Sequence, residues 1–214
     1  MTAHRRFSGV RRAARLGCQA GLSMIETVIV LGVMTALTGV LAPAGLTLVA
    51  QAREVQVQRD CAALRDAVIK LLVDSNQTSI RLRQGRGPRV DLLVSEGAVP
   101  VQDGSSDGRW LREPDQVGTV DVLDHYLVEN APAGDPGNAW PLPSSPDRGG
   151  WRGAYLHAAP DNDPWGHRYA INVRSFGSRN DVIVLSSGAN GVVETPFEAR
   201  GLLAGGDDRA VMVR

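Results

Sequence analysis

An apolar run from Thr27 to Ala50, opened by the single acid Glu26, constrains this chain more than any other feature. Five arginines and no acid precede the run, in residues 1–21. A helix of about 20 apolar residues spans the hydrocarbon core of a bilayer, and arginines beside such a span stay on the cytoplasmic side. The run therefore predicts a single-pass membrane helix, with the C-terminal bulk of the chain exported.

Glu26 is the first candidate functional residue, because an ionisable side chain inside a membrane span is costly and is usually retained for a partner. The segment that contains it, Gly21-Leu22-Ser23-Met24-Ile25-Glu26, resembles the prepilin signature of type IV pilins and of the pseudopilins of type II secretion systems. In that family a membrane aspartyl peptidase cuts after the glycine and methylates the new amino terminus. The resemblance implies cleavage between Gly21 and Leu22, where Leu22 replaces the phenylalanine most often found in the family.

Cleavage would create a free amine on Leu22 close to the carboxylate of Glu26. In an apolar environment, pairing these two groups across neighbouring subunits removes the cost of burying each charge alone. We therefore assign Glu26 to subunit assembly rather than to folding.

Two other interpretations of the apolar run remain open. Ala42-Pro43-Ala44 and Ala50-Gln51-Ala52 both fit the small-residue cleavage site of a secretory signal, but the run is longer than a signal core of ~7–15 residues. A plain single-pass anchor is the third interpretation. Neither alternative gives Glu26 a role.

The charge balance changes when the basic leader is set aside. The chain has 23 basic and 23 acidic residues, and without the five arginines of residues 1–21 its net charge becomes −5. This balance gives no indication of a nucleic-acid partner, which calls for a clustered basic patch. Of the two cysteines, Cys18 lies in the leader, so Cys61 is left as a buried free thiol or as half of an intermolecular bridge.

The helical pattern continues beyond the apolar run. Apolar side chains recur every three or four residues, the spacing of one helix face, at Val57, Cys61, Leu64, Val68 and Leu71 or Leu72. The helix is expected to end around 74–76, and its apolar face would carry a sheet.

The C-terminal part predicts a small antiparallel sheet. His167 to Val173 alternates as a half-buried strand, Asp181 to Ser186 is a second strand, and Ala210 to Val213 closes the sheet. Asp163-Pro164-Trp165-Gly166 and Ser187 to Gly191 are turns. Among the four tryptophans, Trp151 and Trp165 are expected in the core.

The segment from Trp151 to Gly191 is similar to the C-terminal half of the major pseudopilin of type II secretion. It has a tryptophan-arginine-glycine-x-tyrosine-leucine stretch, an aspartate-proline-tryptophan-glycine turn and a serine-x-glycine-alanine-x-glycine turn in the same order. This resemblance implies a calcium site between the turn from Ser186 to Gly191 and the pair Asp207-Asp208, with Ser186, Asn190, Asp207 and Asp208 as ligands. Calcium takes six to eight oxygens from carboxylates, amides and carbonyls. The alternative is a hairpin turn and a solvated pair of acids.

One motif points to an enzyme instead. Gly104-Ser105-Ser106-Asp107-Gly108 fits the G-x-S-x-G pattern of a hydrolase nucleophile elbow, which needs a strand before the serine and a helix after it. Neither flank has that character, so we expect no catalytic activity. A type IV minor pilin and a membrane-tethered, exported binding or hydrolytic domain around Ser106 are the alternatives.

Together these patterns predict an α+β, pilin-like chain in which a long N-terminal transmembrane helix packs on a small antiparallel sheet. Residues 1–21 form the leader, 22–52 the membrane and assembly helix, and 53–214 a periplasmic domain with a helix at 53–75, a variable region at 76–150 and a sheet at 151–214. The expected function is polymerisation into a filament for type II protein secretion from the bacterial inner membrane. The implied partners are other copies of the chain and other pilin-like subunits, the prepilin peptidase, an inner-membrane assembly platform and membrane lipid.

Overall fold

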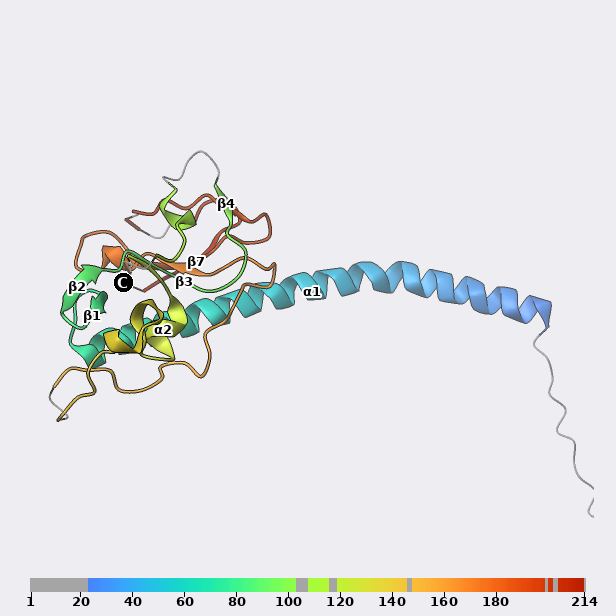
Figure 1. Cartoon of the computed structure of the whole chain (residues 1–214). Helices are drawn as coiled ribbons and strands as arrows, with labels where there is room; N and C mark the ends of the chain where they lie inside the picture. The colour runs from blue at the N-terminus through green and yellow to red at the C-terminus, as the bar shows by residue number, and fades with distance from the viewer. Residues whose placement is uncertain are drawn as a thin grey trace, which may run out of the picture. The chain divides into compact units, whose positions relative to one another are not determined.

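The computed structural model describes residues 23–102, 108–115, 119–145, 148–198, 200–201 and 204–213, except for the side chains at 40 and 42–44. The chain divides into two compact units, Met1–Leu48 and Val49–Arg214. Helix α1, Met24–Ser75, contributes residues to both units (Figure 1).

Both ends of α1 are set by local chemistry. At its start, Ser23 Oγ accepts a hydrogen bond from the backbone N–H of Glu26 (3.3 Å), as an N-cap side chain does. At its end, Asn76 has a positive φ of 51°. The N–H of Asn76 donates to Val73 O and that of Gln77 to Leu72 O, the bond pair of a Schellman motif. The predicted end of the helix at 74–76 is confirmed.

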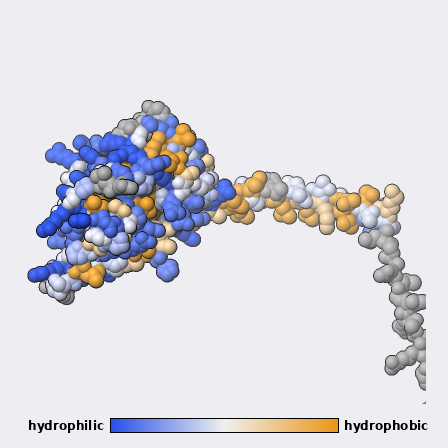
Figure 2. Space-filling view, in the orientation of Figure 1, coloured by the Kyte–Doolittle hydropathy of each residue, from blue (hydrophilic) through white to orange (hydrophobic). Residues whose placement is uncertain are grey.

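The first unit, which ends at Leu48, contains most of the apolar run. Its described large side chains are mostly exposed, from 86% at Met24 to 45% at Val30. Figure 2 shows these side chains in orange along the helix. Among the described residues, however, no helix has the length and apolar character that crossing a bilayer requires.

This finding overturns the expected transmembrane helix at 22–52 and the expected single-pass position in the inner membrane. Thr35, Thr38 and Gly32 lower the hydropathy of the run.

The second unit is α+β and has several sheets. The main sheet has five strands in the order β5-β3-β6-β7-β9. The strands are β3 (Leu92–Val94), β5 (Val120–Val122), β6 (Ala170–Ile171), β7 (Ile183–Ser186) and β9 (Arg209–Met212). β3 and β5 run parallel, with Leu92 opposite Val120, whereas β3-β6, β6-β7 and β7-β9 are antiparallel.

Two small sheets and several short helices complete the unit. β1 (Arg81–Arg83) pairs antiparallel with β2 (Arg86–Arg89), and β4 (Val101–Gln102) pairs parallel with β8 (Val192–Val193). The short helices are α2 (Leu123–Leu127), η1 (Arg109–Leu111), η2 (Pro132–Gly134), η3 (Pro136–Asn138) and η4 (Val173–Ser175). The expectation of a purely antiparallel sheet is thus wrong, because β3-β5 and β4-β8 are parallel. The main sheet also draws β3 and β5 from the region at 76–150.

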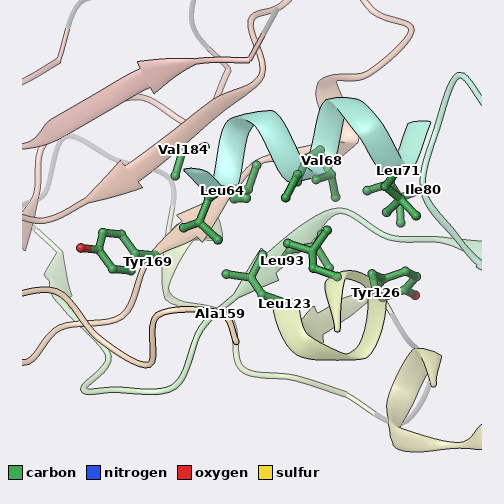
Figure 3. Close-up of a cluster of buried hydrophobic side chains, with 14 of the residues drawn as sticks. Leu64, Val68, Leu71, Ile80, Leu93, Leu123, Tyr126, Ala159, Tyr169 and Val184 are labelled. Atoms are coloured by element: carbon green, nitrogen blue, oxygen red, sulfur yellow. The ribbon is translucent and has the colours of Figure 1, made fainter. Parts of the chain in front are cut away.

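The predicted apolar face of α1 packs on the main sheet. Val57, Cys61, Leu64, Val68 and Leu71 are all fully buried. They share the main core with side chains from the sheet and from α2, among them Leu93, Leu123, Tyr126, Tyr169 and Val184 (Figure 3). Cys61 is a free buried cysteine, and burial raises the pKa of its thiol to about 12.

The tryptophans divide differently from the prediction. Trp110 and Trp140 are the fully buried ones, whereas Trp151 and Trp165 are partly buried and pack at the edge of the main core. Trp110 belongs to a second core on the other side of the sheet, where its ring meets Phe197 edge-on at 4.8 Å. The indole N–H of Trp110 donates to Thr195 O (2.9 Å), which satisfies its only polar atom.

Candidate functional site

The predicted processing site lies outside the described residues, because the description begins at Ser23. The cleavage between Gly21 and Leu22 therefore stays a prediction. Glu26 is described: it is exposed in the first turn of α1, and its backbone N–H is held by Ser23 Oγ.

Ser23 and Glu26 form a local signal that the sequence interpretation missed. A serine followed three residues later by a glutamate is the capping-box pattern that begins a helix. An acid in the first turn also interacts favourably with the positive end of the helix dipole. Glu26 thus has a local role in starting the helix, in addition to any role in assembly.

Two turns of the C-terminal part are tied together by Asp163, which is 2% exposed. One of its carboxylate oxygens, Oδ1, accepts the backbone N–H groups of Trp165 (3.0 Å) and His167 (2.9 Å). The other, Oδ2, accepts the hydroxyl of Ser186 at 2.6 Å. Asp163 therefore closes its own turn and fixes the end of β7.

Two of the predicted calcium ligands already serve this turn. Ser186 is fully buried, and its hydroxyl donates to Asp163 and accepts the N–H of Gly188 (3.2 Å). The side-chain oxygen of Asn190 accepts the N–H of Val192 (2.7 Å). These bonds shape the turn and bring it to Asp207, whose Oδ2 accepts the N–H of Asn190 at 2.9 Å.

Asp208 is 3% exposed and lies immediately before β9. Its Oδ2 accepts three hydrogen bonds, from the backbone N–H groups of Glu194 and Thr195 and from the hydroxyl of Thr195, at 3.0, 2.7 and 2.5 Å. Burial nevertheless raises the pKa of Asp208; the three hydrogen bonds oppose this shift and the negative charge of Glu194 adds to it. The site therefore favours a compensating positive charge.

Glu194 is a third acid at this place, and we name Glu194, Asp207 and Asp208 the acidic turn. Each has one buried carboxylate oxygen without a hydrogen-bond partner, namely Glu194 Oε2, Asp207 Oδ1 and Asp208 Oδ1. The hydroxyl of Ser187 is also buried and unpartnered. Buried carboxylate oxygens are normally satisfied, so each of these orphaned acceptors calls for a partner such as water or a cation.

Glycine backbone surrounds the acidic turn closely. A Cβ at Gly206 would lie 1.2 Å from Glu194 Oε2, and a Cβ at Gly188 would lie 2.2 Å from the carbonyl oxygen of Asp207. Both glycines have positive φ. Only glycine leaves room here for the carboxylates beside the main chain.

Arg209 anchors the acidic turn to α1. Its Nε donates to both carboxylate oxygens of Glu54, at 2.5 and 2.8 Å, and its Nη1 donates to the carbonyls of Asp207 and Asp208. The two ends of the guanidinium thus join the helix to the loop that carries the two aspartates. Within the described part of the chain, no group of three or more His, Cys, Asp or Glu side chains is already arranged as a metal site.

Sequence reasoning found Asp207 and Asp208 but missed Glu194, Arg209 and Glu54. Glu194 follows β8, and its backbone N–H reaches Asp208, 14 positions further on, so no local pattern signals that contact. The candidate nucleophile Ser106 lies outside the described residues.

Comparison with known proteins adds no assignment. No protein-family model, curated protein or solved structure matches this chain.

Proposed function

We propose that this chain is a pilin-like structural subunit, made by cleavage between Gly21 and Leu22 and polymerised into a filament for type II protein secretion. The observation that carries the proposal is the long exposed apolar surface of α1 between Met24 and Val49. Apolar side chains exposed in this number on a folded chain mark an interaction site.

The partner best suited to this surface is the same helix of other copies. The described side chains of α1 from 27 to 50 include no charged residue, so several directions around the helix are open to apolar contact. Fully burying one leucine, isoleucine or valine contributes about 1.5–3 kcal/mol. Helices packed in parallel at 8–10 Å would bury many of them at once.

Within such a bundle, Glu26 would face the amino terminus of a neighbouring copy. A buried carboxylate and a buried ammonium are each costly alone, and pairing offsets that cost while fixing one register. This role concerns the contact between copies, so it leaves the second unit of each copy unaffected.

Calcium at the acidic turn is the second part of the proposal. The orphaned oxygens of Glu194, Asp207 and Asp208 fit the preference of this ion for carboxylates, and the Ser187 hydroxyl adds one more oxygen. When bound, the ion would supply the positive charge that offsets repulsion among three acids. Ser186 and Asn190 would act by shaping the turn, because their side chains are already hydrogen-bonded.

Sequencing the amino terminus of the processed chain tests the cleavage. We expect a start at Leu22, and uncut precursor when Gly21 is changed to leucine, because a bulky side chain blocks the extended backbone that a protease cleft requires. A start after Ala44 or Ala52, or normal processing of Gly21→Leu, contradicts the proposal.

Electron microscopy of filaments sheared from cells that express the full chain and a prepilin peptidase tests assembly. Glu26→Leu should be cleaved and keep the melting temperature of the second unit, yet form no filaments. Asp66→Asn, which changes an exposed acid of the same helix outside the apolar run, is the matched control for assembly. Normal filaments from Glu26→Leu would remove the register role.

Thermal melting of the processed full chain, first with calcium and then with chelator, tests the ion. A ligand that binds only the folded state stabilises it by about 2.7 kcal/mol at 100 times its dissociation constant. The shift should vanish in Glu194→Gln and in the double variant Asp207→Ala with Asp208→Ala. An unchanged melting temperature, or a shift that survives in the double variant, excludes calcium from this site.

A further inference from the structure

A cluster of arginines near the end of α1 has no role in the proposed function. Residues 76–90 and 173–180 contain six arginines and no acid. We name these the arginine surface: Arg81, Arg83, Arg86, Arg89, Arg174 and Arg179.

The two segments of the arginine surface lie against each other. The Arg89 guanidinium donates to the carbonyls of Arg174 and Phe176, and Gly177 lies next to the carbonyl of Thr78. Burial lowers the pKa of Arg89, and the charge of Arg174 lowers it further. Like charges are therefore held close together here.

Few acids neutralise this surface. Asp91 flanks it and pairs with Arg174 at 2.9 Å and with Arg112 at 3.3 Å, so one carboxylate serves two arginines. Arg86 and Arg179 are exposed, and neither has an acidic partner among the described residues. Two long cationic side chains are thus presented to solvent.

Acids gather at the other end of the main sheet, and we name Glu96, Asp124 and Asp161 the acidic surface. These three residues line one small cavity together with Ser95 and Ala159. The Ser95 hydroxyl donates to the carbonyl of Asp161 at 2.7 Å, and Asp124 accepts the N–H of Ala159 at 3.2 Å. Glu96 and Asp161 are exposed, and no described arginine or lysine pairs with them.

Strand β3 separates the two surfaces. Arg89 and Asp91 precede β3, whereas Ser95 and Glu96 follow it. Parallel pairing places Asp124, which follows β5, at the same end as Glu96. Antiparallel pairing with β6 places Arg174, which follows β6, at the same end as Arg89 and Asp91. The sheet topology therefore puts opposite charges at opposite ends of one strand.

We propose that the arginine surface of one copy binds the acidic surface of the next copy in the filament. This inference rests on the proposed function and names a second contact, distinct from the apolar helix. Because the two surfaces differ and lie at opposite ends, the contact is head-to-tail, and a head-to-tail contact that does not close into a ring propagates as an open filament. Complementary charges also select register and suppress wrong contacts.

The acidic surface of a second copy suits the arginine surface better than a nucleic acid does. Residues 22–214 carry a net charge of −5, so a polyanion would be repelled by the rest of the molecule. A second copy presents its acids only at the matching end.

Charge reversal tests the contact in the full chain expressed with a prepilin peptidase. One variant carries Arg86→Glu with Arg179→Glu, and the other carries Glu96→Arg with Asp161→Arg. For each variant expressed alone, the amount of filament in the sheared fraction should fall about tenfold or more, because like charges then face each other. Coexpression of the two variants should restore filaments, since alternating copies regain opposite charges at every contact.

Controls separate this inference from the proposed function. Arg59→Glu changes an exposed arginine of α1 outside both surfaces and should leave filament yield unchanged. If the unaltered chain forms no filaments, the proposed function fails. If it forms filaments and either reversed variant matches it, or if coexpression restores nothing, only the charged contact fails. Retention of the unaltered chain on single-stranded DNA that is lost in Arg86→Glu with Arg179→Glu, together with normal filaments from that variant, would assign the surface to a polyanion instead.

Discussion

The two parts of helix α1 use similar apolar residues in opposite ways. Between Met24 and Leu48 these side chains are largely exposed, whereas between Val57 and Leu71 one face is fully buried on the sheet. In the later part, charged residues such as Arg53, Arg59 and Lys70 occupy the outer face, so the apolar spacing marks one direction of packing. In the earlier part Glu26, in the first turn, is the one charged residue of the sequence, so beyond that turn no charge marks an outer face. The difference teaches that the spacing of apolar residues fixes the direction in which a helix packs only where polar residues occupy its other faces.

Truncating one leucine in each part should give the largest contrast. Leu64→Ala leaves a cavity in the main core and should lower the free energy of unfolding by about 2–5 kcal/mol. Leu37→Ala, at a side chain that is 54% exposed, should change it by less than about 0.5 kcal/mol. Chemical denaturation of the processed chain in mild detergent measures both.

In assembly the two variants should rank the other way, with the larger loss of filament in Leu37→Ala. Leu37→Ala removes apolar area from the proposed contact between copies, so filament yield should fall although the monomer is stable. Equal losses of stability in the two variants would mean that the early part of the helix packs within its own chain.

The packing of the later part of α1 was predictable from the sequence, and the environment of the earlier part was not. The buried residues Val57, Cys61, Leu64, Val68 and Leu71 follow a helical period, and β6, β7 and β9 lie within the stretches predicted as strands to within one residue or so. The stretch Val90 to Val94 allows a short strand or the start of a helix, and β3 shows the strand to be right, whereas β5 escaped because a three-residue strand carries too little periodicity to recognise. The transmembrane assignment is overturned because, among the described residues, no helix is long and apolar enough to cross a bilayer.

The candidate site was predictable only where its residues lie close in sequence. Asp207 and Asp208 are adjacent, and Ser23 and Glu26 share one helical turn, so local patterns can reveal them. Glu194 meets Asp208 across 14 positions and Glu54 meets Arg209 across 155, contacts that depend on strand pairing. The fully buried Trp110 likewise depends on Phe197 and Thr195, which are distant in sequence.

Loss of the hydroxyl that binds the later part of α1 should lower stability, whereas loss of a hydroxyl within the earlier part should not. Tyr169 is buried, and its hydroxyl donates to Asp60 of α1 at 2.9 Å. Tyr169→Phe leaves this carboxylate without its donor and should cost about 1–2 kcal/mol. Thr38→Val removes a hydroxyl that donates only to Met34 O of its own helix, and it should be neutral. A neutral Tyr169→Phe in thermal melting would show that water replaces the phenol at Asp60.

Removing the helix cap should have a smaller effect that is confined to the early part. Ser23→Ala deletes the acceptor of the Glu26 N–H, and loss of an N-cap typically costs about 1 kcal/mol of helix stability. Hydrogen exchange should become faster at Glu26 and Thr27, while the melting temperature of the second unit stays constant. Thr35→Ala, which removes a hydroxyl within the same helix, is the control. Unchanged exchange in Ser23→Ala would exclude the cap.

The smallest predicted effect is a pH dependence that belongs to the second unit alone. His125 Nδ1 lies 2.5 Å from Oδ1 of Asp121, a buried acid whose oxygens also accept the N–H groups of Val122 and Ala133. The hydrogen bond with Asp121 raises the pKa of His125, whereas burial partly opposes the shift. Because the folded-state pKa is the higher one, protonated His125 stabilises the fold fully below its unfolded pKa of about 6.5. This contribution is lost as pH rises through the folded pKa.

Melting the unaltered chain and His125→Gln across pH 5 to 9 isolates this contribution. The stability difference between the two proteins should be greatest at acidic pH and should shrink as pH rises, by less than about 1 kcal/mol, because water reaches the imidazole and screens the pair. A stability difference that is the same at every pH comes from lost packing. Only the part that changes with pH reports the protonation of His125. Hydrogen exchange of the amides in residues 24–48 should be identical in the two proteins once the intrinsic pH effect on exchange is removed, because His125 and Asp121 both lie in the second unit. A difference that grows toward alkaline pH would reverse the sign of the interaction and show that burial, rather than Asp121, controls His125.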